Sequence, residues 1–133
     1  MTTGILIITH CQLGKELINA AELILGNINN ISYVSIMDTT ANEDILKSIE
    51  EKVKNFTDKN NNVLILTDMF GGTPSNLSLS FLEKDRIEVV TGVNLPMLIA
   101  VVGVRDKMKI SELGKIAQEE GRRSVKMAGQ FLE

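Results

Sequence analysis

The sequence is poor in several residue types, and each shortage narrows what the chain can be. Its 133 residues include one cysteine, one histidine and no tryptophan. A lone cysteine cannot form an internal disulfide, so we expect a reducing, cytoplasmic location. One histidine and one cysteine provide none of the ligand spacings typical of metal centres, so we expect neither a metal ion nor another cofactor.

Long apolar runs and blocks of positive charge are also missing. The apolar run near the start, residues 4–8, is shorter than the hydrophobic region of a secretion signal. The run from Leu98 to Val102 falls far short of the roughly 20 residues that span a bilayer. A net charge of −3 with scattered lysines and arginines argues against nucleic acid as a partner.

The chain does contain enough apolar material for one core. Hydrophobic residues make up 44% of it, and no repeat or linker divides it, so we expect a single domain over residues 1–133. Strand-like and helix-like segments alternate, which indicates an α/β fold with a mostly parallel sheet. The expected strands are residues 4–9, 31–36, 63–67 and 87–91, with a short final strand at 124–127. Right-handed crossovers in a doubly wound sheet favour the order 2-1-3-4 for the first four, with helices on both faces.

Helical spacing and capping residues predict the helices between these strands. Three inward faces are expected: Leu13, Leu17, Ala21 and Ile24; Ile45, Ile49, Val53 and Phe56; and Ile110, Leu113, Ile116 and Ala117. Starts are expected at the capping box of Thr40 and Glu43, at Thr73 as the N-cap before Pro74, and at Ser111. Ends are expected at Gly26, near Glu83, near Gly103 and at Gly121.

Two residues with chemical potential follow the two strands expected at the centre of the sheet. His10 comes directly after the first strand and Asp68 after the third, so both should overhang the crevice at the switch in strand order. A neutral imidazole is a good nucleophile near neutral pH, and a carboxylate that accepts from one ring N–H fixes its tautomer. We expect Asp68 to accept from Nδ1 of His10, which leaves Nε2 to attack phosphorus.

A glycine-rich loop after Asp68 is suited to bind the oxygens of a phosphoryl group. The backbone N–H groups of Gly71 and Gly72, the hydroxyl of Thr73 and the start of the following helix are the expected anion-binding groups. The amino end of the first helix is a further source of N–H groups. Positioning and electrostatic stabilisation account for most of the catalysis of phosphoryl transfer.

Three other polar residues near strand ends have roles that the sequence leaves open or that are purely structural. Thr91 and Asn94 follow the fourth strand and either line the crevice or cap a helix. Asp38 ends the second strand, which is off-centre, so we assign it a structural role.

Three blocks of this sequence resemble the mannose-family EIIA component of the bacterial phosphoenolpyruvate-dependent sugar phosphotransferase system (PTS). They are residues 7–10 (IITH), 64–76 (LILTDMFGGTPSN) and 88–97 (EVVTGVNLPM), in the family's order and spacing. The resemblance implies a cytoplasmic phosphocarrier that receives a phosphoryl group from HPr on His10. The group then passes to an EIIB component and to a sugar imported by a membrane EIIC/EIID complex.

The resemblance also implies roles for other residues. The aspartate that pairs with the histidine falls on Asp68, and the hydroxyl of the loop falls on Thr73. Members form homodimers that exchange a carboxyl-terminal strand, whose position matches residues 124–127 and which would cover a sheet edge of the partner. This chain departs from the family at Cys11, where glycine is usual. A side chain there would narrow the approach to His10 or displace a backbone amide, and its thiol raises the hypothesis that oxidation slows transfer.

Two other functions remain open on the sequence. The phosphotransfer subunit of dihydroxyacetone kinase shares the fold and the early histidine but typically lacks the D-x-F-G-G-T-P stretch. A regulatory module read out through phospho-His10 is the other alternative. Response-regulator receivers need an acidic pair after the first strand, and Cys-based phosphatases need an arginine where this chain has Leu17.

Overall fold

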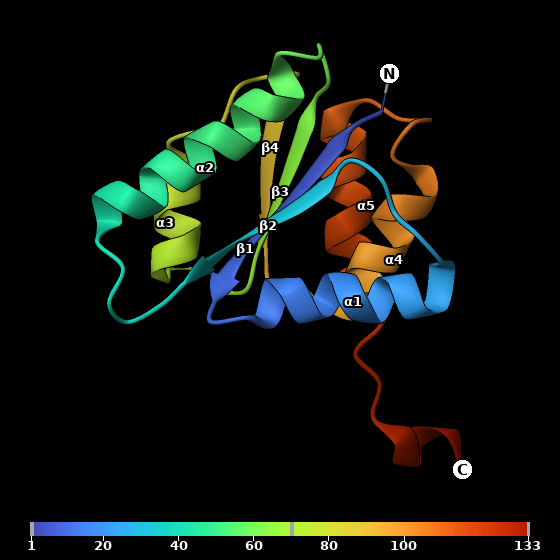
Figure 1. Cartoon of the computed structure of the whole chain (residues 1–133). Helices are drawn as coiled ribbons and strands as arrows, with labels where there is room; N and C mark the ends of the chain where they lie inside the picture. Colours follow the sequence, from blue (N-terminus) through green and yellow to red (C-terminus); the bar gives the residue numbers. More distant parts are fainter. Residues whose placement is uncertain (1, 70, 133) are drawn as a thin grey trace.

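Four apolar segments of the chain pair as the strands of one parallel sheet (Figure 1). The structure is a computed structural model that describes residues 2–69 and 71–132. The strands are β1 (Gly4–His10), β2 (Ile31–Ile36), β3 (Val63–Thr67) and β4 (Ile87–Thr91). Their order, β2-β1-β3-β4, confirms the expected topology, and β1 runs one residue further than predicted, to include His10.

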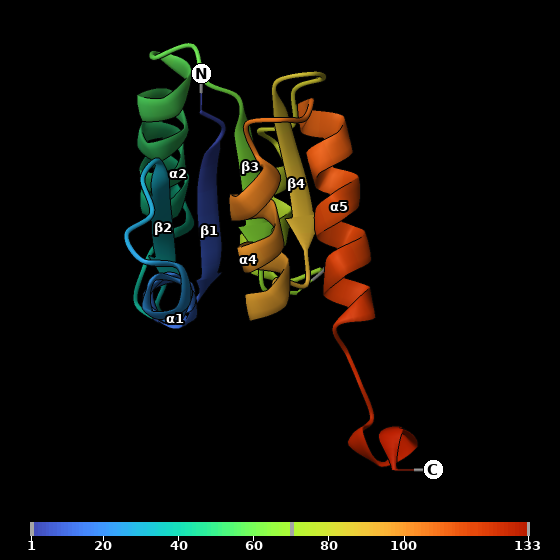
Figure 2. The same cartoon turned by 90° about the vertical axis from the view of Figure 1, so that its right-hand side faces the viewer.

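Helices cover both faces of this sheet, as the turned view shows (Figure 2). On one face lie α1 (Leu13–Leu25), α4 (Leu95–Val104) and α5 (Ile110–Arg123). On the other face lie α2 (Asn42–Thr57) and α3 (Thr73–Leu79). The chain is therefore a single α/β domain of three layers, and the carboxyl ends of its strands share one edge.

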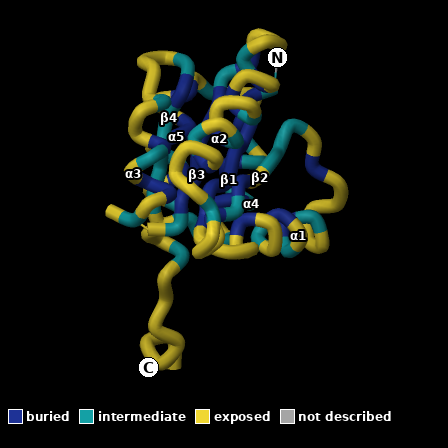
Figure 3. Tube along the Cα trace, turned by 60° about the vertical axis from the view of Figure 1, so that its left-hand side comes forward, coloured by how far each residue is buried: buried dark blue, intermediate teal, exposed yellow. Residues whose placement is uncertain are grey.

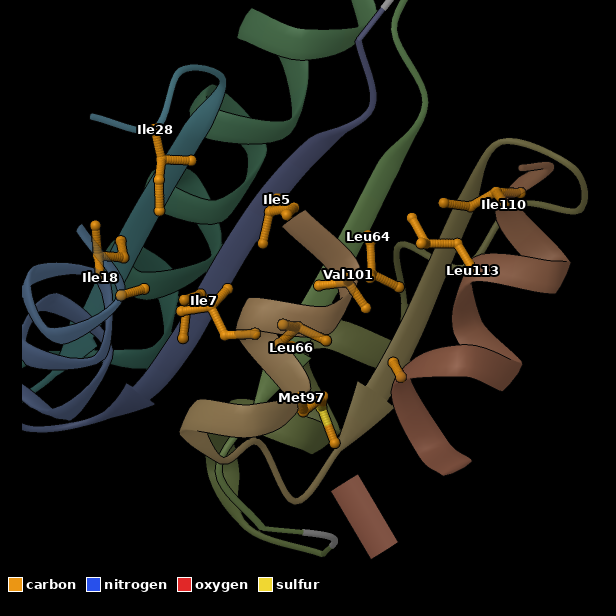
Figure 4. Packing of buried hydrophobic residues seen from close by; sticks show 13 residues of the cluster. Ile5, Ile7, Ile18, Ile28, Leu64, Leu66, Met97, Val101, Ile110 and Leu113 are labelled. Carbon is orange, nitrogen blue, oxygen red and sulfur yellow. The ribbon is translucent and has the colours of Figure 1, made fainter. Parts of the chain in front are cut away.

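The two central strands are apolar from Gly4 to Ile8 and from Val63 to Leu66, because both of their faces are covered there. Ile5 and Ile7 of β1 pack with Leu64 and Leu66 of β3 against α1, α4 and α5 (Figure 4). The alternate residues of the same strands pack against α2 and α3. A trace coloured by burial shows β1 and β3 as the most buried part of the sheet (Figure 3). This double burial holds β1 and β3 rigidly side by side.

The predicted inward face of α2 is confirmed. That of α1 is confirmed at Ala21 and partly at Leu17, but it is wrong at Leu13 and Ile24, because the helix is rotated. Ile45, Ile49, Val53 and Phe56 are all buried. In α1 the buried residues are Gly14, Ile18 and Ala21, while Leu13 and Ile24 are exposed. Gly14 lies directly against β1, since a Cβ added there would be 3.1 Å from Cγ2 of Ile7. Close approach at a residue without a side chain, not apolar periodicity, sets the orientation of α1. In α5, Ile116 is only partly buried, and Gly114 lies inward beside Leu113.

Several predicted helix ends are also wrong. The N-cap residues are Ala41, Gly72 and Lys109, not Thr40, Thr73 and Ser111. Thr73 is instead the first residue of α3, which keeps Pro74 within the first turn, where a missing N–H costs nothing. α3 stops at Leu79, short of Glu83. Gly121 does not end α5 but is buried within it, because a Cβ there would lie 2.6 Å from Cε of Met97 in α4.

The carboxyl-terminal segment differs from its prediction as well. Residues 124–127 form no strand in this chain, and a short 3-10 helix, η1 (Ala128–Phe131), follows them. The segment extends away from the three layers, and its residues from 125 to 132 are exposed (Figure 2). Within residues 2–69 and 71–132, no helix combines the length and apolarity needed to cross a membrane.

A buried arginine fixes the end of the sheet opposite the carboxyl edge. Arg105, just after α4, is only 6% exposed. Its guanidinium donates to the main-chain oxygens of Thr3 (3.3 Å), Asn30 (3.1 Å) and Asn29 (2.7 Å), and to Oδ1 of Asn29. One side chain thereby joins the start of β1, the entry to β2 and the end of α4.

Replacing Arg105 should therefore destabilise the whole domain. Arg105→Met leaves the buried Thr3 carbonyl and the oxygens of Asn29 without their guanidinium donor, and we expect it to lower the free energy of unfolding by about 3 kcal/mol. Urea denaturation measures this difference. Lys107→Met, at an exposed position two residues later, is the matched control and should stay within about 0.5 kcal/mol of wild type. Equal stability of both variants would contradict this role of Arg105.

Candidate active site at the carboxyl edge of the sheet

Parallel pairing of β1 with β3 brings His10 and Asp68 to the same edge. Ile8 is opposite Thr67 in the register, so the next residues of each strand emerge together. Nδ1 of His10 lies 2.8 Å from Oδ2 of Asp68. The two residues are 58 positions apart in the chain, so only the crossover of the fold makes this contact.

The contact determines which ring nitrogen is free. An ionised carboxylate only accepts hydrogen bonds, so Nδ1 carries the proton and donates to Asp68. Nε2 then holds the lone pair of the neutral ring. The side chain of His10 is 48% exposed and that of Asp68 only 12%, so the nucleophilic nitrogen is on the reachable partner.

Asp68 is held in place by three N–H donors. Oδ2 accepts from the main-chain N–H of His10 at 2.9 Å as well as from the ring, and Oδ1 accepts from the N–H of Met69 at 3.0 Å. Burial raises the pKa of the Asp68 carboxyl, but the hydrogen bonds from His10 and the adjacent main chain outweigh it, so the pKa lies below its usual range. Asp68 is therefore a fixed negative charge behind the imidazole.

The glycine loop lies against the imidazole ring. A Cβ added to Gly72 would be 3.3 Å from Cε1 of His10, the ring carbon bonded to both nitrogens. Gly71 has φ +84°, a conformation that side chains disfavour. No acceptor among the residues that the structure describes takes the N–H of Gly72 or Thr73. The loop thus lies beside the carbon that joins the two ring nitrogens, and the hydroxyl-bearing Thr73, next to Gly72, is exposed.

The start of α1 offers fewer free amides than expected. The N–H of Cys11 donates to the oxygen of Ile36 at 2.9 Å, and that of Gly14 donates to Oγ1 of Thr9 at 2.8 Å. Cys11 is exposed rather than buried, and its φ of +51° is a conformation in which glycine is less strained. This explains in physical terms why a glycine suits the position.

For Thr91 and Asn94, at the end of β4, the sequence left open whether each lines the crevice or caps a helix, and the structure places the two residues differently. Asn94 is the N-cap of α4, with its side-chain oxygen accepting from the N–H of Met97 at 3.0 Å. Thr91 lines a cavity of about 400 Å³ together with Glu88 and Lys115, and neither His10 nor Asp68 lines that cavity. Asp38 is exposed at the end of β2. Across the described part of the chain, no group of three potential ligands is placed to hold a metal ion.

Comparisons with known proteins agree with this fold and identify its family. A family model, EIIA-man, described as "PTS system fructose IIA component", matches residues 4–118. The sorbose-specific PTS EIIA component of Lacticaseibacillus casei is 34% identical over 112 residues, which cover 82% of this chain and 78% of that protein. The mannose-specific EIIAB component of Escherichia coli K12 is 33% identical over 128 residues, covering 95% of this chain but 39% of that protein. This chain therefore spans well under half of the longer relative.

Solved structures show the same architecture. The PTS IIA protein associated with the fucose utilization operon of Streptococcus pneumoniae matches over 100% of both chains, with a TM-score of 0.86 and 27% identity. EIIA from Streptococcus agalactiae has a TM-score of 0.87 at 23% identity, over 96% of this chain and 98% of that one. The fold and the sequence matches thus define a component of phosphotransferase type. Within that class, the chain belongs to the EIIA-man family of PTS IIA components.

The depressed pKa of Asp68 predicts a pH dependence of stability. A carboxyl whose folded-state pKa is lowered stabilises the protein above the pKa of the unfolded chain, about 3.9 for Asp. That contribution is lost as the pH falls through the folded-state pKa. We expect the stability gap between wild type and Asp68→Asn to be widest near pH 7 and to narrow toward about pH 3.

Urea denaturation at a series of pH values measures this gap. Asp38→Asn, which removes a negative charge from another strand end, controls for net charge. A gap that stays constant over the whole range would show that the Asp68 carboxylate is not stabilised by its contacts.

Proposed function

We propose that this chain is a cytoplasmic phosphocarrier of the sugar phosphotransferase system. Nε2 of His10 accepts the phosphoryl group from phospho-HPr and passes it to an EIIB component, which serves uptake through a membrane EIIC/EIID complex. The observation that carries the proposal is the 2.8 Å contact of Nδ1 with Asp68, which makes Nε2 the lone-pair nitrogen of the neutral tautomer on a half-exposed ring. The relatives are named for different sugars, so no sugar is assigned to this chain.

The geometry supports an in-line transfer. The lone pair of Nε2 forms the bond to phosphorus while the bond from phosphorus to the donor breaks and its electron pair leaves with the donor. Positive charge develops on the ring, and the Asp68 carboxylate behind Nδ1 offsets it. The N–H groups of Gly71, Gly72 and Thr73, with the Thr73 hydroxyl, stabilise the phosphoryl oxygens, which Asp68 would repel.

Phosphorylation with purified carriers tests the relay. Phosphoenolpyruvate, enzyme I and HPr should label the wild-type protein with acid-labile, base-stable phosphate, and His10→Ala should abolish the label. Asp68→Asn should slow labelling by about 10²- to 10⁴-fold, because the amide no longer enforces the reactive tautomer. Asp38→Asn, an exposed aspartate at another strand end, should leave the rate unchanged.

Three results would contradict parts of the proposal. Persistent labelling of His10→Ala would remove His10 as the acceptor. An unchanged rate for Asp68→Asn would remove Asp68 from the mechanism. Labelling without onward transfer to any EIIB component would favour the regulatory module over the transport component.

We also propose that the chain works as a homodimer that exchanges its carboxyl-terminal segment. The exposed segment contains four large apolar residues, Val125 (78% exposed), Met127 (65%), Phe131 (69%) and Leu132 (89%). β4 is an edge strand. Its first residue, Ile87, already pairs with Glu83, and the N–H of Val89 donates to Oε1 of Glu88, so another strand would add along the rest of this edge. Apolar surface on an extended segment and an open sheet edge are complementary in a pair of chains.

Charges placed on that segment should prevent the exchange. The double variant Val125→Asp, Met127→Asp alters only exposed positions, so we expect a folded monomer where wild type is a dimer, as measured by sedimentation equilibrium. Lys126→Asp changes charge at the exposed position between them and is the control. A monomeric wild-type protein would contradict the proposed exchange.

A further inference from the structure

Asn76, the central residue of α3, donates to the glycine loop from both its side chain and its main chain. Its side-chain Nδ2 donates to the main-chain oxygen of Gly71 at 3.2 Å. Its main-chain N–H donates to the oxygen of Gly72 at 2.9 Å. Asn76 is exposed, and the contact to Gly71 is its only side-chain hydrogen bond within the described residues, so burial in the core does not account for it.

These two bonds orient two peptide groups. A peptide unit is planar and trans, so its C=O and N–H point in opposite directions. The carbonyl of Gly71 shares its peptide with the N–H of Gly72, and the carbonyl of Gly72 shares its peptide with the N–H of Thr73. Because both carbonyls point toward Asn76, both N–H groups point away from it.

The direction of these N–H groups matters because of where the loop lies. Gly72 lies against Cε1 of His10, the ring carbon bonded to Nε2, since a Cβ built on Gly72 would be 3.3 Å from it. The Gly71–Gly72 peptide would otherwise be the less constrained of the two, since glycine at φ +84° has no Cβ to hinder its rotation. Donors that are oriented before the reaction stabilise developing charge without a cost of reorganisation during it.

We propose that Asn76 is a positioning residue for phosphoryl transfer. Its side chain holds the Gly71 carbonyl and thereby directs the N–H of Gly72 toward the oxygens of a phosphoryl group on Nε2. Asn76 itself does not touch the phosphoryl group. This inference rests on the proposed function of His10 as the phosphoryl acceptor.

The test compares Asn76→Ala and Asn76→Asp with wild type. Alanine removes only the bond to Gly71, because the main-chain N–H remains. Aspartate keeps the size of the side chain but cannot donate from it at neutral pH. Ser80→Ala is the matched control, since the Ser80 hydroxyl at the end of the same helix donates to the oxygen of Leu77 and not to the loop.

Two phosphoryl donors separate this inference from the relay. Phospho-HPr tests the role of Asn76 and the relay together, whereas phosphoramidate is a small chemical donor that needs no carrier. With phosphoramidate, the bond from Nε2 to phosphorus forms, the phosphorus–nitrogen bond of the reagent breaks, and ammonia leaves. If wild type reacts with phosphoramidate but not with phospho-HPr, the relay fails and the role of Asn76 is judged on the chemical donor alone.

We expect both Asn76 variants to lower the maximal rate of phosphoryl acceptance about tenfold with either donor. The KM for phospho-HPr should be unchanged, because the Asn76 side chain orients the loop and does not bind the carrier.

In ¹⁵N–¹H spectra, phosphorylation should shift the amide protons of Gly72 and Thr73 downfield in wild type and Ser80→Ala. The shift of Gly72 should be smaller in Asn76→Ala. Melting temperatures confirm that each variant is folded. Maximal rates equal to that of Ser80→Ala, with wild-type amide shifts, would overturn the inference and leave the relay intact.

Discussion

The hydrogen bond between His10 and Asp68 is the interaction on which the proposed chemistry depends, and the parallel pairing of β1 with β3 makes it possible. These two strands are the centre of the sheet and are buried on both faces. Their register leaves the two side chains 2.8 Å apart at the carboxyl edge. Because the strands cannot slide without exposing their apolar side chains on both faces, the geometry of the imidazole is as rigid as the core itself.

The negative charge of Asp68 and the N–H donors of the glycine loop lie on different sides of the His10 ring. Behind Nδ1 is a carboxylate whose acceptor capacity is used by His10 and the N–H of Met69. Beside the ring is a loop whose carbonyls are turned toward Asn76. The arrangement supports a transient positive charge on the imidazole and, at the same time, presents N–H donors to an anion. One carboxylate could not do both, since it would repel the anion.

Much of the fold followed from the sequence because its signals were local and strong. The strands at residues 31–36, 63–67 and 87–91 match their predicted bounds, since each is a short segment rich in β-branched residues between turn or loop residues. The order of the strands was correct because right-handed crossovers leave few arrangements. The orientation of α1 was missed because Gly14, not a large apolar residue, makes the closest approach to β1. The role of Gly121 was missed for the same reason: its contact with Met97 of α4 is invisible in the sequence of α5.

The candidate site also combines features that the sequence predicted with features that only the tertiary structure decided. The sequence by itself determined which side chains stand at the ends of the central strands, and the combination of a lone histidine, an aspartate and a glycine loop led to the hypothesis of phosphoryl transfer. Only the tertiary structure decided the contact of Nδ1 with Oδ2, the exposure of the ring, and the engagement of the Cys11 and Gly14 amides elsewhere. It also revealed Asn76, whose side chain reads in the sequence as one more polar residue of a helix. The physical reason is that strand ends are set by local patterns, whereas hydrogen-bond partners are set by which elements pack together.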